Sequence, residues 1–345
     1  MSDHGKGGEL DIFLDGIALI GAFLAILVMI RGAANMLVMA AMWMLYMSIV
    51  NVGQTWFSFG WESQLLETGF LAIWSVPVLS LSRFPANLPS PNLVVWGNRW
   101  LIFRIMIGAG LIKIRGDQCW KDLTCMNYFY QTQPNPNPLA YFAHQAPEGW
   151  HMFETFGNHV IELGFPLLTF LPLRAGWIFN GCWQIIFQTV LISTGNLSFL
   201  NWLTVAPSIW YLDDRFLAQF FSAETRKHIR ELQDEDEVQP RPRTHWLRRL
   251  ANLVVGLGIA WLSLPIIANL ASPNQAMNRS FDPLRLVNTY GAFGSVTKER
   301  TEVVLEGTAA FNPEDPSAAW EAYEFKCKPG KAIIIIIIIN IIIDN

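Results

Sequence analysis

The sequence has few charged side chains. Asp, Glu, Lys and Arg together make up 15% of its 345 residues, whereas an ordinary soluble domain carries about 25%. Hydrophobic residues, by contrast, supply 52% of the chain. This shortage of charge argues against a soluble domain and is typical of a membrane protein. The net charge of −4 gives no indication of a nucleic-acid partner.

Cysteine is also scarce. The four cysteines are Cys119, Cys125, Cys182 and Cys327. Four are too few for a protein built on a disulfide framework, and their spacing lacks the paired close spacings of a zinc site. The sequence also shows no nucleophile motif, nucleotide-binding loop or dense cluster of metal ligands. We therefore expect no cofactor.

Long apolar runs predict membrane-spanning helices instead. A helix needs about 20 apolar residues to cross a bilayer. Eight stretches approach that length, so the sequence predicts an all-α polytopic membrane helical bundle within residues 1–272. The seventh stretch is short and contains Pro207, so eight is an upper value. The stretches are 12–30, 35–51, 64–82, 94–114, 152–172, 175–194, 197–212 and 247–270.

Basic residues orient this predicted bundle. The linker 213–249 holds eight Arg and Lys residues, the strongest basic cluster in the chain. The positive-inside rule places it in the cytosol. Alternation then places the N-terminus, the loop 115–150 and everything after residue 270 on the lumenal side. Two N-glycosylation sequons, at Asn196 and Asn278, fall on that side, and Asn196 is close to the membrane.

The residue pattern changes after the last apolar run. Thr301–Gly307 and Trp320–Gly330 alternate apolar and polar residues, which predicts strands. Two strands alone are marginal in water, so residues 273–330 are predicted to begin an incomplete β-rich lumenal domain. Residues 331–345 form a low-complexity tail, in which ten of the eleven residues from 333 to 343 are isoleucine. Our hypothesis is that this tail is a translated repeat or a gene-model error that follows a C-terminal truncation.

Ionisable residues in the apolar stretches are candidates for an intramembrane polar network. Arg104 lies near the middle of the fourth stretch, where a charge is costly and is usually paired. Glu62 and Glu67 are its candidate partners in a structural ion pair. Lys113 is either a snorkelling residue with its head in water or a cation at the mouth of a cavity. The candidate network comprises Glu62, Glu67, Arg104, Lys113, Glu154, Asn158, His159 and Glu162.

Part of this network shares one helix face. Glu154, Asn158 and Glu162 recur every four residues, and His159 stands beside them. Carboxylates and a histidine at this spacing could bind a metal or move protons. A metal would require matching ligands on a second helix, which the sequence does not show. An interhelical hydrogen-bond network is therefore favoured over a metal site.

The predicted lumenal loop 115–150 is rich in aromatic residues and proline. Cys119 and Cys125 could form a disulfide there if the compartment is oxidising. Closely spaced prolines predict an extended, stiff segment, which with its aromatic neighbours is a candidate surface for another polypeptide. The alternative is a loop lying along the membrane interface, which aromatic residues also favour. The candidate surface residues are Trp120, Tyr128, Tyr130, Pro134, Pro136 and Pro138.

Three stretches of the chain resemble the lipase maturation factor family. They are "VGQTWFSFGWESQLLETGFLAI" (Val52–Ile73), the long block from "GAGLIKIRGDQCW" to "GFPLLTF" (Gly108–Phe170) and "YEFKCKPG" (Tyr323–Gly330). The resemblance implies a multi-pass endoplasmic reticulum membrane protein that helps secreted lipases of the lipoprotein lipase type fold and assemble into homodimers. It implies action by binding rather than catalysis, with a C-terminal lumenal region engaging the client. Family members usually have fewer spans than eight and a cytosolic N-terminus.

A weaker likeness links the membrane part to the transmembrane region of vitamin K-dependent carboxylases. It implies an alternative function, a membrane-embedded enzyme in which Lys113, His159 and Glu162 line a catalytic cavity. A folding factor should tolerate Lys113→Ala or His159→Ala as long as it stays folded, whereas an enzyme should not. The isoleucine tail supports a third interpretation, an inert scaffold or the product of a pseudogene.

Overall fold

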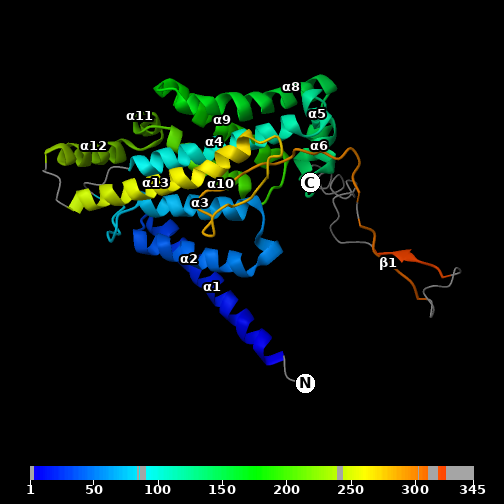
Figure 1. Cartoon of the computed structure of the whole chain (residues 1–345), viewed down its shortest axis with the longest axis horizontal. Helices are drawn as coiled ribbons and strands as arrows, with labels where there is room; N and C mark the ends of the chain where they lie inside the picture. The colour runs from blue at the N-terminus through cyan, green and yellow to red at the C-terminus, as the bar shows by residue number, and fades with distance from the viewer. Residues whose placement is uncertain are drawn as a thin grey trace, which may run out of the picture. The chain divides into compact units, whose positions relative to one another are not determined.

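The computed structural model describes residues 4–83, 85, 91–238, 244–301, 303–309 and 318–323. These residues are mostly helical and form thirteen α-helices and two short strands (Figure 1). The isoleucine tail lies outside the described residues, as does Cys327. The α-helices are α1 (His4–Arg31), α2 (Met36–Val52), α3 (Gly60–Ser75), α4 (Asn92–Arg115), α5 (Gln118–Lys121), α6 (Met126–Thr132), α7 (Pro138–His144), α8 (Glu148–His159), α9 (Arg174–Thr194), α10 (Leu200–Ser208), α11 (Asp214–Leu217), α12 (Ala223–Val238) and α13 (Thr244–Ala271).

Short helical turns of other geometry extend several of these helices. A π-helix, η2 (Val160–Gly164), continues α8, and a 3₁₀-helix, η3 (Phe165–Phe170), follows it. The other 3₁₀-helices are η1 (Gln54–Phe57), η4 (Ile209–Tyr211) and η5 (Ala218–Phe220).

The eight apolar stretches all contain helix, so the predicted helical membrane protein is confirmed at that level. Within the described part of the chain, three helical segments are long and apolar enough to cross a membrane: Asp11–Arg31, Arg174–Thr194 and Trp246–Ala271. The helix α2 is apolar but shorter. Eight membrane crossings therefore stay a prediction, because five of the stretches do not meet both criteria of length and apolarity.

Two compact units divide the chain. Unit 1 comprises Met1–Gly116, Gly157–Thr189 and Ser198–Gly294, and unit 2 comprises Asp117–Phe156, Val190–Leu197 and Ser295–Asn345. Unit 1 therefore contains the long apolar helices. Unit 2 contains most of the predicted lumenal loop 115–150.

The helix α4 is the centre of unit 1. It packs against α3, α10, α13 and the turns η2, η3 and η4 (Figure 1). Small residues make these close approaches possible. A Cβ atom at Gly97 would lie 2.6 Å from a methyl group of Leu71, and one at Gly110 would lie 2.6 Å from a methyl group of Leu163.

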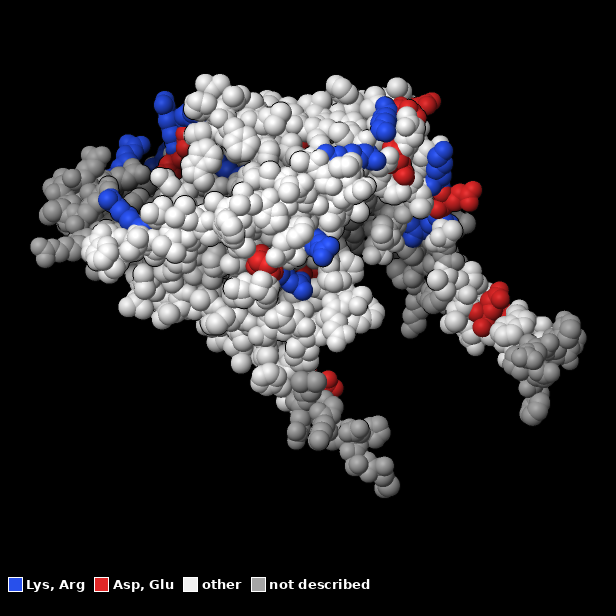
Figure 2. Space-filling view, in the orientation of Figure 1, with Lys and Arg blue, Asp and Glu red and all other residues white. Residues whose placement is uncertain are grey.

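The outward faces of unit 1 are apolar. Leu253, Leu257 and Trp261 of α13 are exposed, as are Phe13, Leu19 and Phe23 of α1. Figure 2 shows a surface without charged side chains over most of α13. A bilayer removes the cost of exposing such faces, since lipid tails are as apolar as leucine.

The predicted β-rich domain is not supported. The strands β1 (Glu306–Gly307) and β2 (Glu321–Ala322) have two residues each and pair antiparallel, with Glu306 opposite Ala322. The remainder of the second predicted strand, residues 324–330, lies outside the described residues. Two-residue strands bury too little apolar area to hold an independent sheet.

Candidate functional site

The first buried polar cluster of unit 1 centres on Glu67 of α3. Its carboxylate pairs with the guanidinium of Arg104 of α4, and the two residues are only 2% and 1% exposed. Glu62 is buried as well, but Arg104 bonds Glu67 rather than Glu62. The structure thus selects one of the two partners that the sequence offered.

Two residues that the sequence analysis did not single out complete this cluster. Asn288 donates its backbone N–H to Glu67 Oε2 over 3.1 Å and its side-chain amide to the same oxygen over 3.0 Å. The hydroxyl of Tyr290 donates to that oxygen as well, over 2.8 Å. Arg104 Nη1 donates to the carbonyl oxygen of Asn288 over 2.6 Å. No periodicity or motif marks Asn288 or Tyr290, so a single sequence carries no signal for them.

The segment 275–294, which we call the strap, therefore packs within unit 1. Gln275 donates to the carbonyl oxygen of Gly108 over 3.0 Å and accepts from Arg115 over 2.9 Å. Cβ atoms at Gly108 and Gly116 would collide with the carbonyl oxygens of Tyr290 and Gly294, respectively. The sequence placed the strap at the start of a separate lumenal domain. In the structure the strap makes buried bonds to α3 and α4 within unit 1, and the boundary of the lumenal domain stays a prediction.

The second buried polar cluster joins α4 to the α8–η2 segment. Lys113 Nζ lies 2.5 Å from Glu162 Oε1 and donates to Asn158 Oδ1 over 3.1 Å. Asn158 in turn donates to Glu162 Oε2 over 2.9 Å. Lys113 is only 4% exposed, so its ammonium does not snorkel into water. His159, the neighbour of Asn158, is half-buried.

A π-helical turn supports this second cluster. Phe165 donates its N–H to the carbonyl oxygen of Val160, five residues earlier, and Glu162 lies within the turn. The following residue, Pro166, has no N–H and cannot continue the α-helical bonding pattern. Such π-bulges occur frequently at functional sites. Here the turn contains Glu162, whose side chain is buried.

Glu154 belongs to a different cluster, in unit 2. It accepts bonds from Tyr130 Oη over 3.0 Å and from Trp150 Nε1 over 2.8 Å, and it lies 3.0 Å from His151 Nδ1. The predicted face of Glu154, Asn158 and Glu162 is therefore divided. Asn158 and Glu162 act with Lys113 in unit 1, whereas Glu154 ties α6 to α8 in unit 2.

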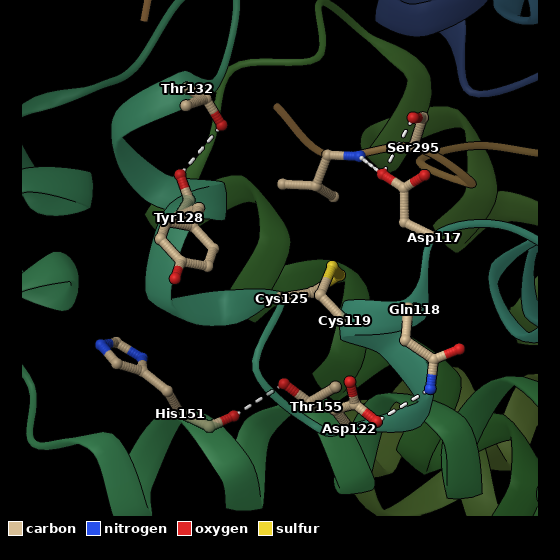
Figure 3. Close-up of a disulfide and its surroundings, with 11 residues drawn as sticks. Asp117, Gln118, Cys119, Asp122, Cys125, Tyr128, Thr132, His151, Thr155 and Ser295 are labelled. Carbon is tan, nitrogen blue, oxygen red and sulfur yellow. Dashed lines mark hydrogen bonds between the residues drawn. A yellow bond between two sulfur atoms is a disulfide. The ribbon is translucent and has the colours of Figure 1, made fainter. Parts of the chain in front are cut away.

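The structure joins Cys119 and Cys125 in a disulfide (Figure 3). Their Cα atoms are 4.7 Å apart, and the bond links α5 to the residue that precedes α6. Nearby, Asp117 accepts bonds from the hydroxyl of Ser295 over 2.9 Å and from the N–H of Val296 over 2.7 Å (Figure 3). These bonds fasten the chain beyond the strap to the disulfide region of unit 2.

The candidate polypeptide-binding residues have mixed positions. Trp120 and Tyr130 are only 1% and 3% exposed. They pack inside unit 2 and cannot form an outer surface, which corrects the sequence interpretation for these two residues. Tyr128 and Pro136 are half-buried, and Pro134 is exposed.

The proline segment is shorter than the sequence suggested. Pro138 is the first residue of α7, and Asn137 caps that helix by accepting from the N–H of Ala140 over 2.9 Å. Only residues 133–137 lie between α6 and α7. Several apolar side chains of this unit are exposed instead. Five of them on α7 and α8, which we call the aromatic surface, are Leu139, Tyr141, Phe142, Trp150 and Phe153.

The two sequons differ in their surroundings. The Asn278 side chain donates to the carbonyl oxygen of Gly291 over 3.1 Å, so attachment of a glycan would disturb this bond. Asn196 is exposed in the connection between α9 and α10. A glycan at either residue stays a prediction.

Comparison with known proteins gives matches along most of the chain. The family model for the lipase maturation factor transmembrane domain matches residues 4–219, and the model for the lipase maturation factor C-terminal domain matches residues 286–338. No solved structure matches the chain.

Curated relatives cover more of the chain. Lipase maturation factor 1 of Mus musculus is 55% identical over 329 residues, which are 93% of this chain and 57% of the relative. Lipase maturation factor 1 of Homo sapiens is 56% identical over 327 residues, which are 93% of this chain and 58% of that relative. Lipase maturation factor 2 of Xenopus tropicalis is 38% identical over 219 residues, 62% of this chain and 31% of that protein. The chain thus spans a little over half the length of the first two relatives.

Proposed function

Because the chain belongs to the lipase maturation factor family, we propose that it assists the maturation of secreted lipases of the lipoprotein lipase type. Its place of action is the endoplasmic reticulum membrane, in which it is a multi-pass protein. It binds a lipase monomer while the monomer folds and until a second monomer docks to form the homodimer. The names of the relatives support the lipase as client, and binding without covalent chemistry is our proposal.

The aromatic surface of unit 2 is the structural observation that carries this mechanism. Its exposed Tyr141, Phe142 and Trp150 offer apolar rings next to polar groups, a composition common at protein interfaces. The disulfide and the Tyr130–Glu154 bond support it from within the same unit. A folding lipase exposes apolar surface that such rings could cover.

A rescue experiment tests the proposal. The chain is expressed with lipoprotein lipase in cells that lack their own maturation factor, and the specific activity of secreted lipase is measured. We expect the unaltered chain to restore activity and Tyr141→Ser/Phe142→Ser to restore much less. The matched control is Phe220→Ser/Phe221→Ser, which alters two exposed phenylalanines in unit 1. No rescue by an unaltered chain that is present and membrane-inserted would contradict the proposal.

The enzymatic alternative has one observation in its favour, the buried Lys113–Glu162 pair next to a π-helical turn. Lys113 bonds both Glu162 and Asn158, and Asn158 bonds Glu162, which favours a structural role. The double substitution Lys113→Met/Glu162→Met separates the two functions, because replacing both members of a buried pair by apolar residues is often neutral for stability. A folding factor should then retain lipase rescue, and an enzyme that uses Lys113 should lose it.

A further inference from the structure

Arg99 of α4 is a buried cation with no carboxylate partner in the described part of the chain. It is only 7% exposed. Its Nε donates to the carbonyl oxygen of Trp210 over 3.1 Å, and within the described residues this is the only hydrogen bond of its side chain. Burying a guanidinium without a counter-charge costs free energy, so an anionic ligand at this position would stabilise the protein.

Aromatic rings enclose the guanidinium. Its Cζ atom lies 4.1 Å from the ring centroid of Trp177, 5.4 Å from that of Trp96 and 5.5 Å from that of Tyr211. Rings at these distances attract a cation through their negative faces, and they fix the guanidinium in one place. They supply no negative charge, however, and therefore do not replace a counter-ion.

The cage itself is rigidly built. Tyr211 donates to the carbonyl oxygen of Arg99 over 3.2 Å, and its hydroxyl lies 2.6 Å from that of Thr169. Trp177 donates to the carbonyl oxygen of Thr169 over 3.1 Å. At Gly181, a Cβ atom would lie 2.7 Å from the Cβ of Tyr211, so α9 can approach η4 closely only because that residue is glycine.

The terminal nitrogens of Arg99 remain available. Within the described residues, Nη1 and Nη2 donate to no group. Neither nitrogen is completely enclosed by protein atoms, however. They therefore keep some accessible area, at which a ligand can approach the guanidinium. A planar guanidinium presents its N–H groups as a fork that fits a phosphate group.

The cage lies close to one end of three helical elements. Arg99 is in the second turn of α4, Trp177 is in the first turn of α9, and Tyr211 ends η4. The exposed ion pair of Arg174 with Asp213 lies next to it along the chain. Tryptophans collect where lipid headgroups meet the apolar core, and a second-turn residue is only about 10 Å along the helix axis from the helix start.

We propose that Arg99 binds the phosphate group of an anionic phospholipid. The ligand must carry a net negative charge, because only then does it compensate the buried guanidinium. In a choline phospholipid the phosphate charge is already offset within the headgroup. The rings of Trp96 and Trp177 then border the headgroup, and the cage orients the fork toward the phosphate oxygens.

The test uses the full chain purified in a neutral detergent. Thermal unfolding midpoints are measured with phosphatidic acid, with phosphatidylcholine and with inorganic phosphate, and bound lipid is identified by native mass spectrometry. We expect phosphatidic acid alone to raise the midpoint and to remain bound. In Arg99→Gln the affinity for phosphatidic acid should fall at least tenfold, and Arg99→Lys should show an intermediate loss.

Arg174→Gln is the matched control, since it removes an exposed arginine that already has a carboxylate partner. It should keep the response to phosphatidic acid. An equal response in wild type and Arg99→Gln, or no response in wild type, would overturn the proposal. A response to inorganic phosphate that equals that to phosphatidic acid would overturn the assignment to a lipid. If Arg99→Gln does not fold, Arg99→Lys provides the test. An unchanged affinity of Arg99→Lys for phosphatidic acid would contradict binding through the planar guanidinium.

Discussion

At the scale of single residues, Glu67 combines several buried hydrogen bonds. One carboxylate accepts from Arg104, from the backbone and side chain of Asn288 and from Tyr290. Such partners offset the large free-energy cost of desolvating a buried charge. The strap and α4 are therefore held by the same acceptor.

We expect Glu67→Gln to destabilise the protein strongly. The substitution leaves Arg104 as an uncompensated buried charge, which typically costs about 3–5 kcal/mol. The measurement is the thermal unfolding midpoint in detergent. Glu62→Gln is the control, since Glu62 is also buried while its Oε2 has no hydrogen-bond partner among the described residues. An equal fall of the unfolding midpoint in the two variants would contradict the stabilising role of the Glu67–Arg104 ion pair.

Asp213 gives a prediction about pH. Its hydrogen bond from Arg174 is the largest cause that holds the pKa of this carboxyl below its usual value of 3.8, and the N–H of Phe216 acts in the same direction. A depressed pKa stabilises the folded state above pH 4, and this contribution is lost as the pH falls through the lower folded pKa.

The effect should be visible in a comparison of wild type with Asp213→Asn. We expect the difference between their unfolding midpoints to be present at pH 6 and to shrink as the pH falls below about 4. The difference should be small, because both partners are partly exposed and solvent screens the pair. A difference that grows on acidification would refute this assignment.

At the scale of elements, the strap is held by close backbone contact with α4. The carbonyl oxygen of Tyr290 occupies the space that a side chain at Gly108 would need. Gly108 is otherwise unfavourable inside a helix by about 0.5–1 kcal/mol relative to alanine. The close approach of the Tyr290 carbonyl requires glycine here, which explains why the helix carries this unfavourable residue.

We expect Gly108→Ala to displace the strap and to destabilise unit 1 by about 1–3 kcal/mol, the usual cost of overpacking. Limited proteolysis should then cut within 275–294 faster than in wild type. In Gly157→Ala, by contrast, the added methyl meets nothing within 4 Å. That control should be neutral or slightly stabilising, and faster cleavage in both variants would speak against a specific contact.

The disulfide is the corresponding constraint in unit 2. The cysteines are six positions apart, and closing so short a loop stabilises by about 2 kcal/mol in the chain-entropy model. We expect Cys119→Ser/Cys125→Ser to lower the unfolding midpoint and to reduce lipase rescue. Thiol alkylation with and without a reductant reports the bond directly. Unchanged rescue in a folded double variant would show that the aromatic surface does not need this support.

At the scale of the whole molecule, membrane topology follows from the distribution of charge. The basic linker 213–249 and the predicted lumenal loop 115–150 should lie on opposite sides of the bilayer. In intact microsomes we expect trypsin to cut the linker and to leave the residues of unit 2 uncut until detergent is added. Protection of the linker in intact vesicles would reverse the predicted orientation.

The sequence by itself determined the helical membrane character, the family and a candidate set of polar residues. Long apolar runs and the scarcity of charge are local or compositional properties, so they can be read without knowledge of the packing. The pairing of Arg104 with an acidic residue of α3 followed from the cost of a buried charge, although the choice of Glu67 over Glu62 did not.

Only the tertiary structure decided which groups meet. Tyr290 reaches Glu67 across 223 positions of sequence, and no periodic pattern encodes such a contact. Packing also buried Lys113, Trp120 and Tyr130, which the sequence had allowed to face water or a partner. The side on which a residue lies depends on the neighbouring helices, and their small residues and carbonyl groups act only once the bundle is assembled.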